Sequence, residues 1–216
     1  MAATLLLDFD GTITVQDVST EILRRFAKGD WKVWDRRAIT FQVPVYQALR
    51  EQFRMVDADK EEVLKFIDEK IEVREGFEEF IGFLAKRGVP WAVLSEGLDF
   101  YMERVVGRFH LRPGAIFAYR SWFEGRHIEL QPQWIWEGCE RCGTCKRRIV
   151  KAFKHLGIVI YVGDSVTDFC VADVVDYLFA RGKLEAFAKK MNISFIHYDN
   201  FYDVMKGVEM ILEGKK

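Results

Sequence analysis

Carboxylate pairs near both ends of the chain are the features of this sequence best able to do chemistry. Asp8 and Asp10 follow one apolar run, and Asp164 and Asp168 follow a second apolar run at 158–163. The carboxyl ends of parallel strands meet at one edge of a sheet, where open α/β folds hold their ligands. We therefore expect the four carboxylates to converge at such an edge.

A cluster of carboxylates at one sheet edge needs a cation. Two carboxylates about 4 Å apart repel each other by about 4 kcal/mol at an effective dielectric near 20. Oxygen ligands without histidine or cysteine select a hard ion, and Mg²⁺ favours carboxylate together with phosphate oxygens. The sequence therefore predicts a Mg²⁺ site, with Asp8, Asp10, Asp164 and Asp168 as its candidate ligands.

Each acidic pair also has a purely structural interpretation. Asp10-Gly11 is a common turn pair in hairpins. Ser165 and Asp168 have the spacing of a capping box that would open a helix over 166–175, and this role is compatible with metal binding. Gly163 would allow a sharp turn after the strand, and a helix N-terminus there would favour a nearby anion.

Two further motifs lie between the acidic pairs. Ser95-Glu96-Gly97 ends an apolar run, and Lys146 opens a helical one. Taken alone, Ser95 would be an N-cap for a helix over 97–109, and Lys146 would be a surface lysine at a helix start. Beside two acidic pairs, we favour a binding role for both.

Hydrophobic periodicity predicts an α/β architecture. Short, nearly continuous apolar runs indicate strands buried on both faces, at 4–8, 91–95, 158–163 and 177–180. Helical periods occur over 76–87, 97–109, 145–156, 166–175, 181–191 and 200–213. This alternation favours a doubly wound parallel sheet with right-handed crossovers.

Two segments interrupt the alternation. Residues 15–75 carry helical periods without a strand-like run, so we predict a helical subdomain inserted in a core made of residues 1–14 and 76–216. The segment 112–138 indicates a β-hairpin excursion with its turn near Gly125.

In content and order, the four motifs resemble those of the haloacid dehalogenase superfamily of phosphatases. The matching residues are Asp8-Phe-Asp10-Gly-Thr12, Ser95, Lys146 and Gly163-Asp164-Ser-Val-Thr-Asp168, and the resemblance covers nearly the whole chain. It implies a Rossmann-like core with a helical cap at 15–75 and a phosphatase that forms an aspartyl-phosphate. Asp8 would be the nucleophile, and Asp10 would act as general acid and then as general base.

The resemblance implies roles for the remaining motif residues. Thr12 would orient Asp10, whereas Ser95 and Lys146 would hold the transferring phosphoryl oxygens. Lys146 would also balance the charge of Asp8. Glu96 and Gly97 follow Ser95 directly, so we include them among the candidate substrate-binding residues.

By the same resemblance, Mg²⁺ is held by Asp8, the backbone carbonyl of Asp10 and Asp164, with a less direct role for Asp168. Asp17 occupies a place where related phosphoserine phosphatases contact their substrate, but it could equally cap the first helix of the inserted segment. Aromatic and sulfur-containing residues of that segment could line an apolar pocket or form its own core, namely Phe41, Tyr46, Phe53 and Met55.

Within the superfamily, looser stretches are similar to the methionine-salvage phosphatases that act on 2-hydroxy-3-keto-5-methylthiopentenyl-1-phosphate. These stretches are Arg74-Glu-Gly-Phe, the approach to Lys146, the run at 179–184 and Asp199-Asn-Phe-Tyr. A thioether tail would suit an apolar pocket. A small polar monoester such as phosphoserine, phosphocholine or phosphoethanolamine is the alternative.

Charge and composition exclude partners bound through bulk charge. Lys and Arg number 32 against 33 Asp and Glu, so a nucleic-acid or membrane-surface partner is not expected and a small phosphorylated metabolite is. The chain has no bilayer-length apolar run, and its start lacks the pattern of a secretory signal. We expect a cytoplasmic protein and leave a homodimer open.

The cysteines suggest a rival class. Cys139, Cys142 and Cys145 are spaced like zinc ligands, but a local disulfide or packed reduced thiols are also compatible with this spacing. A non-catalytic zinc or redox module could dock through the nearby tryptophans Trp122, Trp134 and Trp136. That hypothesis leaves the two acidic pairs unexplained.

Overall fold

The computed structural model describes residues 2–136 and 141–214. Within them, seven strands form one sheet in the order β4-β3-β2-β1-β5-β6-β7. Neighbouring strands are parallel except for the antiparallel pair β3 and β4. The strands are β1 (Ala3–Leu7), β2 (Trp91–Leu98), β3 (Ile116–Glu124), β4 (His127–Gln131), β5 (Ile158–Gly163), β6 (Tyr177–Ala180) and β7 (Ile196–His197). The predicted α/β class with a mainly parallel sheet is confirmed.

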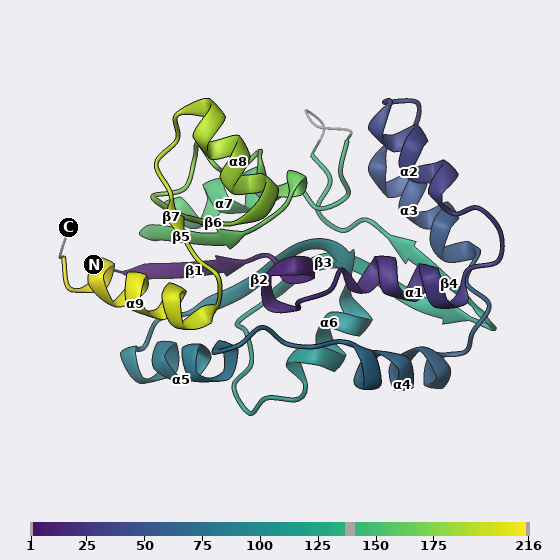
Figure 1. Cartoon of the computed structure of the whole chain (residues 1–216), viewed down its shortest axis with the longest axis horizontal. Helices are drawn as coiled ribbons and strands as arrows, with labels where there is room; N and C mark the ends of the chain where they lie inside the picture. The colour runs from purple at the N-terminus through teal and green to yellow at the C-terminus, as the bar shows by residue number, and fades with distance from the viewer. Residues whose placement is uncertain (1, 137–140, 215–216) are drawn as a thin grey trace.

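Helices cover both faces of the sheet, with α7 and α8 on one side and α5 and α6 on the other (Figure 1). The helices are α1 (Val18–Phe26), α2 (Lys32–Ile39), α3 (Val45–Arg54), α4 (Lys60–Lys70), α5 (Phe77–Arg87), α6 (Asp99–Val106), α7 (Lys146–Lys154), α8 (Gly182–Met191) and α9 (Phe201–Leu212). Short helical turns follow two strands, η1 at Phe9–Ile13 and η2 at Val166–Asp168.

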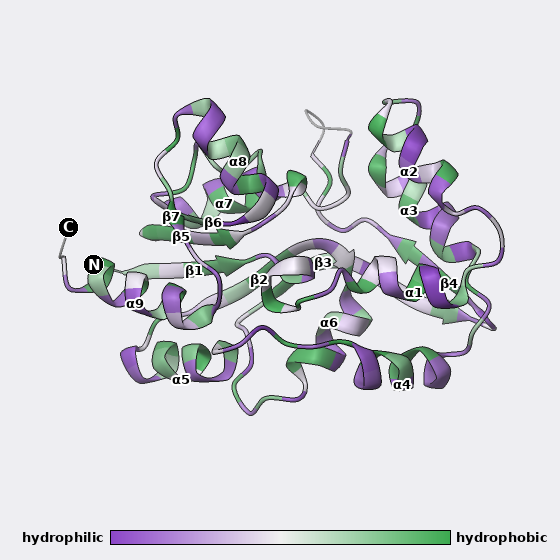
Figure 2. Ribbon diagram, in the orientation of Figure 1, coloured by the Kyte–Doolittle hydropathy of each residue, from purple (hydrophilic) through white to green (hydrophobic). Residues whose placement is uncertain are grey.

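Each central strand contributes to a hydrophobic core on both faces of the sheet. In β1, Leu5 and Leu7 pack with α5, α6 and α9, whereas Leu6 packs with α7 and α8. Successive side chains of a strand point to opposite faces, so only a continuous apolar run can fill both cores. Figure 2 shows β5 largely in green, whereas helices such as α4 and α5, at the bottom of the view, alternate green and purple.

The helical segment 15–75 contains α1 to α4 and joins β1 to α5. It is tied to the β3–β4 hairpin, because Arg54 donates to both carboxylate oxygens of Glu129, at 2.7 and 3.1 Å. Arg126 of the hairpin turn pairs with Asp57 at 2.6 Å. These contacts fix α3 beside β4, whereas α4 lies next to α6 on the other side of the view (Figure 1).

One expectation from the sequence needs correction, and a second is extended. The helix predicted over 166–175 is a single 3₁₀ turn, Val166–Asp168, followed by further turns. Its capping partner is present, since Asp168 accepts the N–H of Ser165 at 3.0 Å, but the chain does not continue as an α-helix. The hairpin predicted at 112–138 is found, and β3 also pairs with β2, so it extends the main sheet.

No helix in the described ranges is long and apolar enough to cross a membrane.

Candidate active site

The loop after β1 brings both N-terminal aspartates to the carboxyl edge of the sheet. The N–H of Asp8 donates to Val162 O of β5 at 2.9 Å, which extends the β1–β5 pairing by one residue. The chain then turns tightly, with Gly11 at φ 79°. A Cβ at Gly11 would lie 2.7 Å from Asp164 Oδ2, so glycine meets both a left-handed conformation and a close approach.

Arg74 stabilises this turn through hydrogen bonds to its backbone carbonyl oxygens. Its guanidinium donates to Thr12 O at 2.9 Å and to Gly11 O at 2.5 Å. Arg74 is buried, and the carbonyl oxygens it binds are ones that the tight turn leaves without regular partners. This contact gives a structural role to one of the looser stretches noted in the sequence.

Lys146, the first residue of α7, places its ammonium between two carboxylates. Lys146 Nζ donates to Asp8 Oδ1 at 2.8 Å and to Asp168 Oδ1 at 2.7 Å. Burial lowers the pKa of Lys146, but attraction to Asp168 and Asp8 outweighs burial and raises that pKa above its usual value. The lysine is therefore charged, in keeping with the expectation that it balances Asp8.

Asp168 uses both of its oxygens on donors within the protein. Oδ1 accepts from Lys146 and from the Tyr161 hydroxyl at 2.6 Å, and Oδ2 accepts the N–H groups of Asp164 and Ser165 at 3.0 Å. This carboxylate is fully buried. Its contacts make it the partner of Lys146 and the anchor of the turn after β5.

Thr12 contacts Asp164 and not the Asp10 carboxylate that we expected it to orient. Thr12 Oγ1 donates to Asp164 Oδ1 at 3.0 Å, and the Tyr198 hydroxyl donates to Thr12 Oγ1 at 3.4 Å. Burial, followed by repulsion from Asp168, raises the pKa of Asp164. The fold places Asp164, from the second acidic pair, next to the turn that carries Thr12. Thr12 therefore contacts Asp164.

Three carboxylates of the described chain lie close enough to share a cation. Oxygens of Asp8, Asp164 and Asp168 are all within 4.8 Å of one another. The pKa of Asp8 is raised well above its usual value by burial and then by the charge of Asp168. Such a site favours a bound cation, because burial and mutual repulsion both oppose the charged carboxylates.

Asp10 lies in the same pocket but turns toward the helical segment. Asp10 Oδ1 accepts the Val18 N–H at 2.7 Å, and Oδ2 accepts the Tyr101 hydroxyl at 2.8 Å. Burial, together with the charge of Asp17, raises the pKa of Asp10 to about 8. Asp17 itself caps α1 by accepting the Thr20 N–H at 2.7 Å, and it also lines the pocket.

Ser95 lies inside β2, so it does not cap a helix. Its buried Oγ accepts the Gly97 N–H at 3.1 Å. Glu96 is partly buried, and its Oε2 has no hydrogen-bond partner among the residues described. Burial raises the pKa of Glu96 to about 7, while Lys146 and a hydrogen bond from Cys142 oppose this rise.

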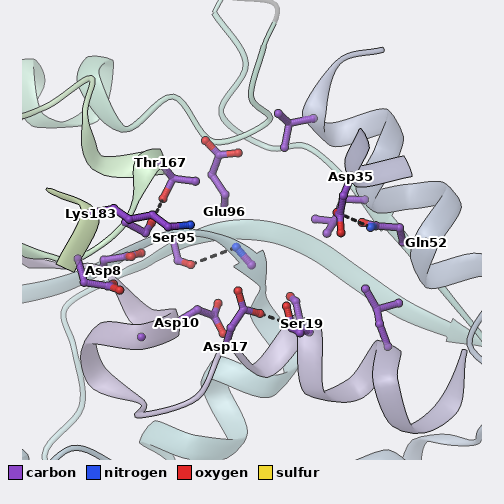
Figure 3. Close-up of a pocket in the computed structure, with 18 of the residues that line it drawn as sticks. Asp8, Asp10, Asp17, Ser19, Asp35, Gln52, Ser95, Glu96, Thr167 and Lys183 are labelled. Atoms are coloured by element: carbon purple, nitrogen blue, oxygen red, sulfur yellow. Dashed lines mark hydrogen bonds between the residues drawn. The ribbon is translucent and has the colours of Figure 1, made fainter. Parts of the chain in front are cut away.

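Several of these residues line a pocket of about 530 Å³ between the sheet edge and the helical segment, whereas the buried Lys146 and Asp168 are not part of its lining. Figure 3 shows Asp8, Ser95 and Lys183 on one side of it, and Asp35 bonded to Gln52 on the other. The apolar part of its lining is Leu23, Trp31, Val45 and Leu49. In the described chain, the lining does not include Phe41, Tyr46, Phe53 or Met55, the residues suggested by the sequence.

The cysteine hypothesis is only partly addressed by the structure. Cys145 is buried at the start of α7, and Cys142 is partly buried near Glu96. Cys139 lies outside the described residues, so the predicted three-cysteine cluster does too. The group of metal-binding side chains found in the described part is the acidic one.

The sequence pattern does not single out three tyrosines that contact the motif residues, namely Tyr101, Tyr161 and Tyr198. It predicts only a helix around Tyr101 and a buried strand around Tyr161. A buried tyrosine hydroxyl needs a hydrogen-bond partner, but its partner lies far away in sequence. A hydroxyl within an otherwise apolar pattern is the one signal that could have indicated them.

Comparison with known proteins agrees with this geometry. Residues 5–173 match the haloacid dehalogenase-like hydrolase family. A 2-hydroxy-3-keto-5-methylthiopentenyl-1-phosphate phosphatase from Brevibacillus brevis is 30% identical over 213 residues, covering 96% of this chain and 95% of that protein. A phosphatase of the same name from Geobacillus kaustophilus is 29% identical over 209 residues, covering 95% and 94%.

Solved structures show the same fold. A substrate-bound phosphoserine phosphatase complex superposes with a TM-score of 0.71 at 23% identity, covering 95% of this chain and 98% of that one. The family match spans most of the chain and contains all four motifs. The chain therefore belongs to the haloacid dehalogenase-like hydrolases, and within them it is a phosphatase that hydrolyses phosphoric monoesters.

Proposed function

We propose that this phosphatase removes phosphate from a small phosphorylated metabolite through an aspartyl-phosphate on Asp8, with Mg²⁺ as its cofactor. The observation that carries the proposal is the position of Asp8, which contacts Lys146 and lies beside Asp164 in one pocket with Asp10. A nucleophile, a fixed positive charge and a proton donor are what acyl-phosphate chemistry requires together.

The donor set fits Mg²⁺. Asp8 and Asp164 offer carboxylate oxygens within 4.8 Å of each other, and the family resemblance adds the backbone carbonyl of Asp10. Asp168 is the less suitable ligand, because protein donors already occupy both of its oxygens. When bound, Mg²⁺ would neutralise charge on the phosphoryl group and on these carboxylates.

The first chemical step transfers the phosphoryl group to the protein. An Asp8 oxygen attacks phosphorus, the bond between phosphorus and the leaving oxygen breaks, and Asp10 gives its proton to that oxygen. Lys146 and Ser95 hold phosphoryl oxygens during the transfer. The raised pKa of Asp10, about 8, favours the protonated form that this step needs near neutral pH.

The second step regenerates Asp8. Asp10, now a carboxylate, takes a proton from water as that water attacks the phosphorus of the aspartyl-phosphate. The bond between phosphorus and Asp8 breaks, and inorganic phosphate leaves. One residue therefore serves as acid and then as base, which requires its carboxyl group to stay in place through both steps.

For the substrate, we favour 2-hydroxy-3-keto-5-methylthiopentenyl-1-phosphate, the compound named for the bacterial relatives. The helical segment 15–75 would act as a cap whose apolar side chains Leu23, Trp31 and Leu49 receive the methylthio tail. Glu96 also lines the pocket, and we propose that it contacts a polar group of the substrate. A metabolite of this kind agrees with the cytoplasmic location expected from the sequence.

A phosphate ester carrying an amino group, such as phosphoserine, is the second candidate. Carboxylates of Asp17 and Asp35 on the cap side of the pocket favour it. Asp17 already accepts the Thr20 N–H and Asp35 accepts an N–H of the Gln52 amide, each through Oδ1, so each carboxylate has only part of its acceptor capacity left for an ammonium group.

A panel of phosphate esters compared by kcat/KM tests the proposal. We expect Mg²⁺-dependent hydrolysis, with the methylthio ester preferred over phosphoserine and phosphocholine by about 10-fold or more. Asp8→Asn should abolish turnover of every ester, whereas the matched surface change Asp173→Asn should not. Full activity in Asp8→Asn would exclude the covalent mechanism, and equal rates across the panel would exclude the methionine-salvage substrate.

A further inference from the structure

Tyr101 connects the proton-transferring residue to the helical segment. Its hydroxyl donates to Asp10 Oδ2 at 2.8 Å and lies 3.0 Å from Ser19 Oγ. Tyr101 belongs to α6, Ser19 to α1, and Asp10 to the turn after β1. Three separate elements therefore meet at one phenol oxygen, and Figure 3 shows Ser19 beside Asp10 and Asp17 at the pocket wall.

The position of this phenol is fixed by packing. Tyr101 is fully buried, and its ring lies against Phe9, with 5.8 Å between ring centroids. A Cβ at Gly97 would lie 1.7 Å from the Tyr101 hydroxyl and 2.7 Å from Asp10 Oδ2. The pair of side chains thus rests directly on the backbone of β2, where only glycine leaves enough space.

Hydrogen bonds hold the Asp10 carboxyl group at both of its oxygens. Oδ1 takes the Val18 N–H and Oδ2 takes the Tyr101 hydroxyl, so the plane of the carboxyl group is set by two donors on different elements. A phenol can donate one hydrogen bond while it accepts another, which lets Ser19 hold Tyr101 without competing for Asp10.

We propose that Tyr101 is a positioning residue, which fixes the Asp10 carboxyl group for proton transfer to the leaving oxygen and links that geometry to the helical segment through Ser19. The inference rests on the proposed function of Asp10. It extends that function, because the four family motifs do not include Tyr101 or Ser19. Loss of the phenol hydroxyl would leave the carboxyl group held at one oxygen only.

Leaving-group dependence provides the test. An alkyl phosphate needs a proton on its leaving oxygen, whereas 4-nitrophenyl phosphate departs as a stable anion, and kcat/KM reports only the steps through the first transfer. We expect Tyr101→Phe to lower kcat/KM for an alkyl phosphate by about 10-fold or more, and for 4-nitrophenyl phosphate by no more than about 2-fold. Inhibition by inorganic phosphate should stay unchanged, because phosphate binding does not use this proton.

Two variants control for structural effects. Tyr119→Phe removes another buried hydroxyl, which accepts the Gly143 N–H at 2.8 Å, and it should leave the ratio of the two kcat/KM values unchanged. Ser19→Ala should shift that ratio in the same direction as Tyr101→Phe but by less, since Tyr101 still donates to Asp10.

The outcomes separate this inference from the proposed function. Equal losses on both esters in Tyr101→Phe, or no loss on either, would overturn the positioning role while leaving the phosphatase mechanism intact. If Asp8→Asn keeps its activity, the covalent mechanism itself is wrong, whatever Tyr101→Phe does.

Discussion

Lys146 Nζ lies 2.8 Å from Asp8 Oδ1, although 138 positions separate the two residues in the chain and both side chains are buried. The same ammonium also contacts Asp168, so one positive charge serves two carboxylates. A buried charge is tolerated only when it is paired, and here the pairing joins the first motif to the third. The ammonium therefore compensates the charge of both carboxylates, one of which is the proposed nucleophile Asp8.

Lys146→Met should remove activity and also destabilise the fold. It leaves Asp8 and Asp168 buried without their positive partner, and breaking a buried pair in this way costs about 3–5 kcal/mol. We expect a clear drop in melting temperature, measured by calorimetry in the absence of metal, together with loss of phosphatase activity.

Asp8→Asn is the matched comparison for that prediction. It removes one of two carboxylates that repel each other, so it should abolish activity without lowering the melting temperature of the metal-free protein. A melting temperature that falls as far as in Lys146→Met would show that Asp8 serves mainly to stabilise the fold.

Asp164→Asn should weaken Mg²⁺ binding. Ligands that bind only the folded state raise its stability by mass action, so Mg²⁺ should raise the melting temperature of the wild-type protein. The variant should need an Mg²⁺ concentration at least about 10-fold higher, both for the same rise in melting temperature and for half-maximal activity. Asp176→Asn, which removes a carboxylate paired with Lys154 at 2.9 Å, is the control. An unchanged Mg²⁺ requirement in Asp164→Asn would place the metal elsewhere.

Glu96→Gln should change how stability depends on pH. The pKa of Glu96 rises from 4.5 to about 7 on folding, so the folded state keeps a proton that the unfolded chain has released. The resulting stabilisation is complete below pH 4.5 and is lost as pH rises through about 7. We expect the melting temperature of the metal-free wild type to fall from pH 5 to pH 8. The fall in Glu96→Gln should be smaller than in the wild type by about 2–4 °C.

The exposed residue Glu103 provides the comparison for this measurement. Glu103→Gln on α6 should follow the wild-type profile. The same dependence in Glu96→Gln and wild type would mean that Glu96 is not the group that takes up the proton.

Val45→Thr tests the apolar wall of the pocket. The two side chains have nearly the same shape, but the threonine hydroxyl would have to lose water when a methylthio group binds. We expect kcat/KM for the methylthio ester to fall by about 3–10-fold, with that for phosphoserine nearly unchanged. Equal losses on the two esters would point to a disturbed start of α3, because the Val45 N–H bonds to Arg141 O at 2.8 Å.

The sequence alone determined the α/β class, because local patterns carry it. Strand β5 is an apolar run long enough to fill both cores, and α6 shows the spacing of a single buried face. Motifs that follow such strands must reach the same sheet edge, so the approach of Asp8 to Asp164 was also predictable. The haloacid dehalogenase resemblance followed from the order of these motifs.

Only the tertiary structure decided how each site side chain is used. Thr12 contacts Asp164, and Asp168 accepts hydrogen bonds from Lys146 and Tyr161. These contacts form because elements far apart in sequence pack at one place. The segment 166–175 also forms a short turn where its periodicity indicated a helix, and Asp168 of that turn pairs with Lys146 from another element. Spacing along the chain fixes which residues reach the sheet edge, but hydrogen-bond partners depend on distances across the fold that periodicity does not encode.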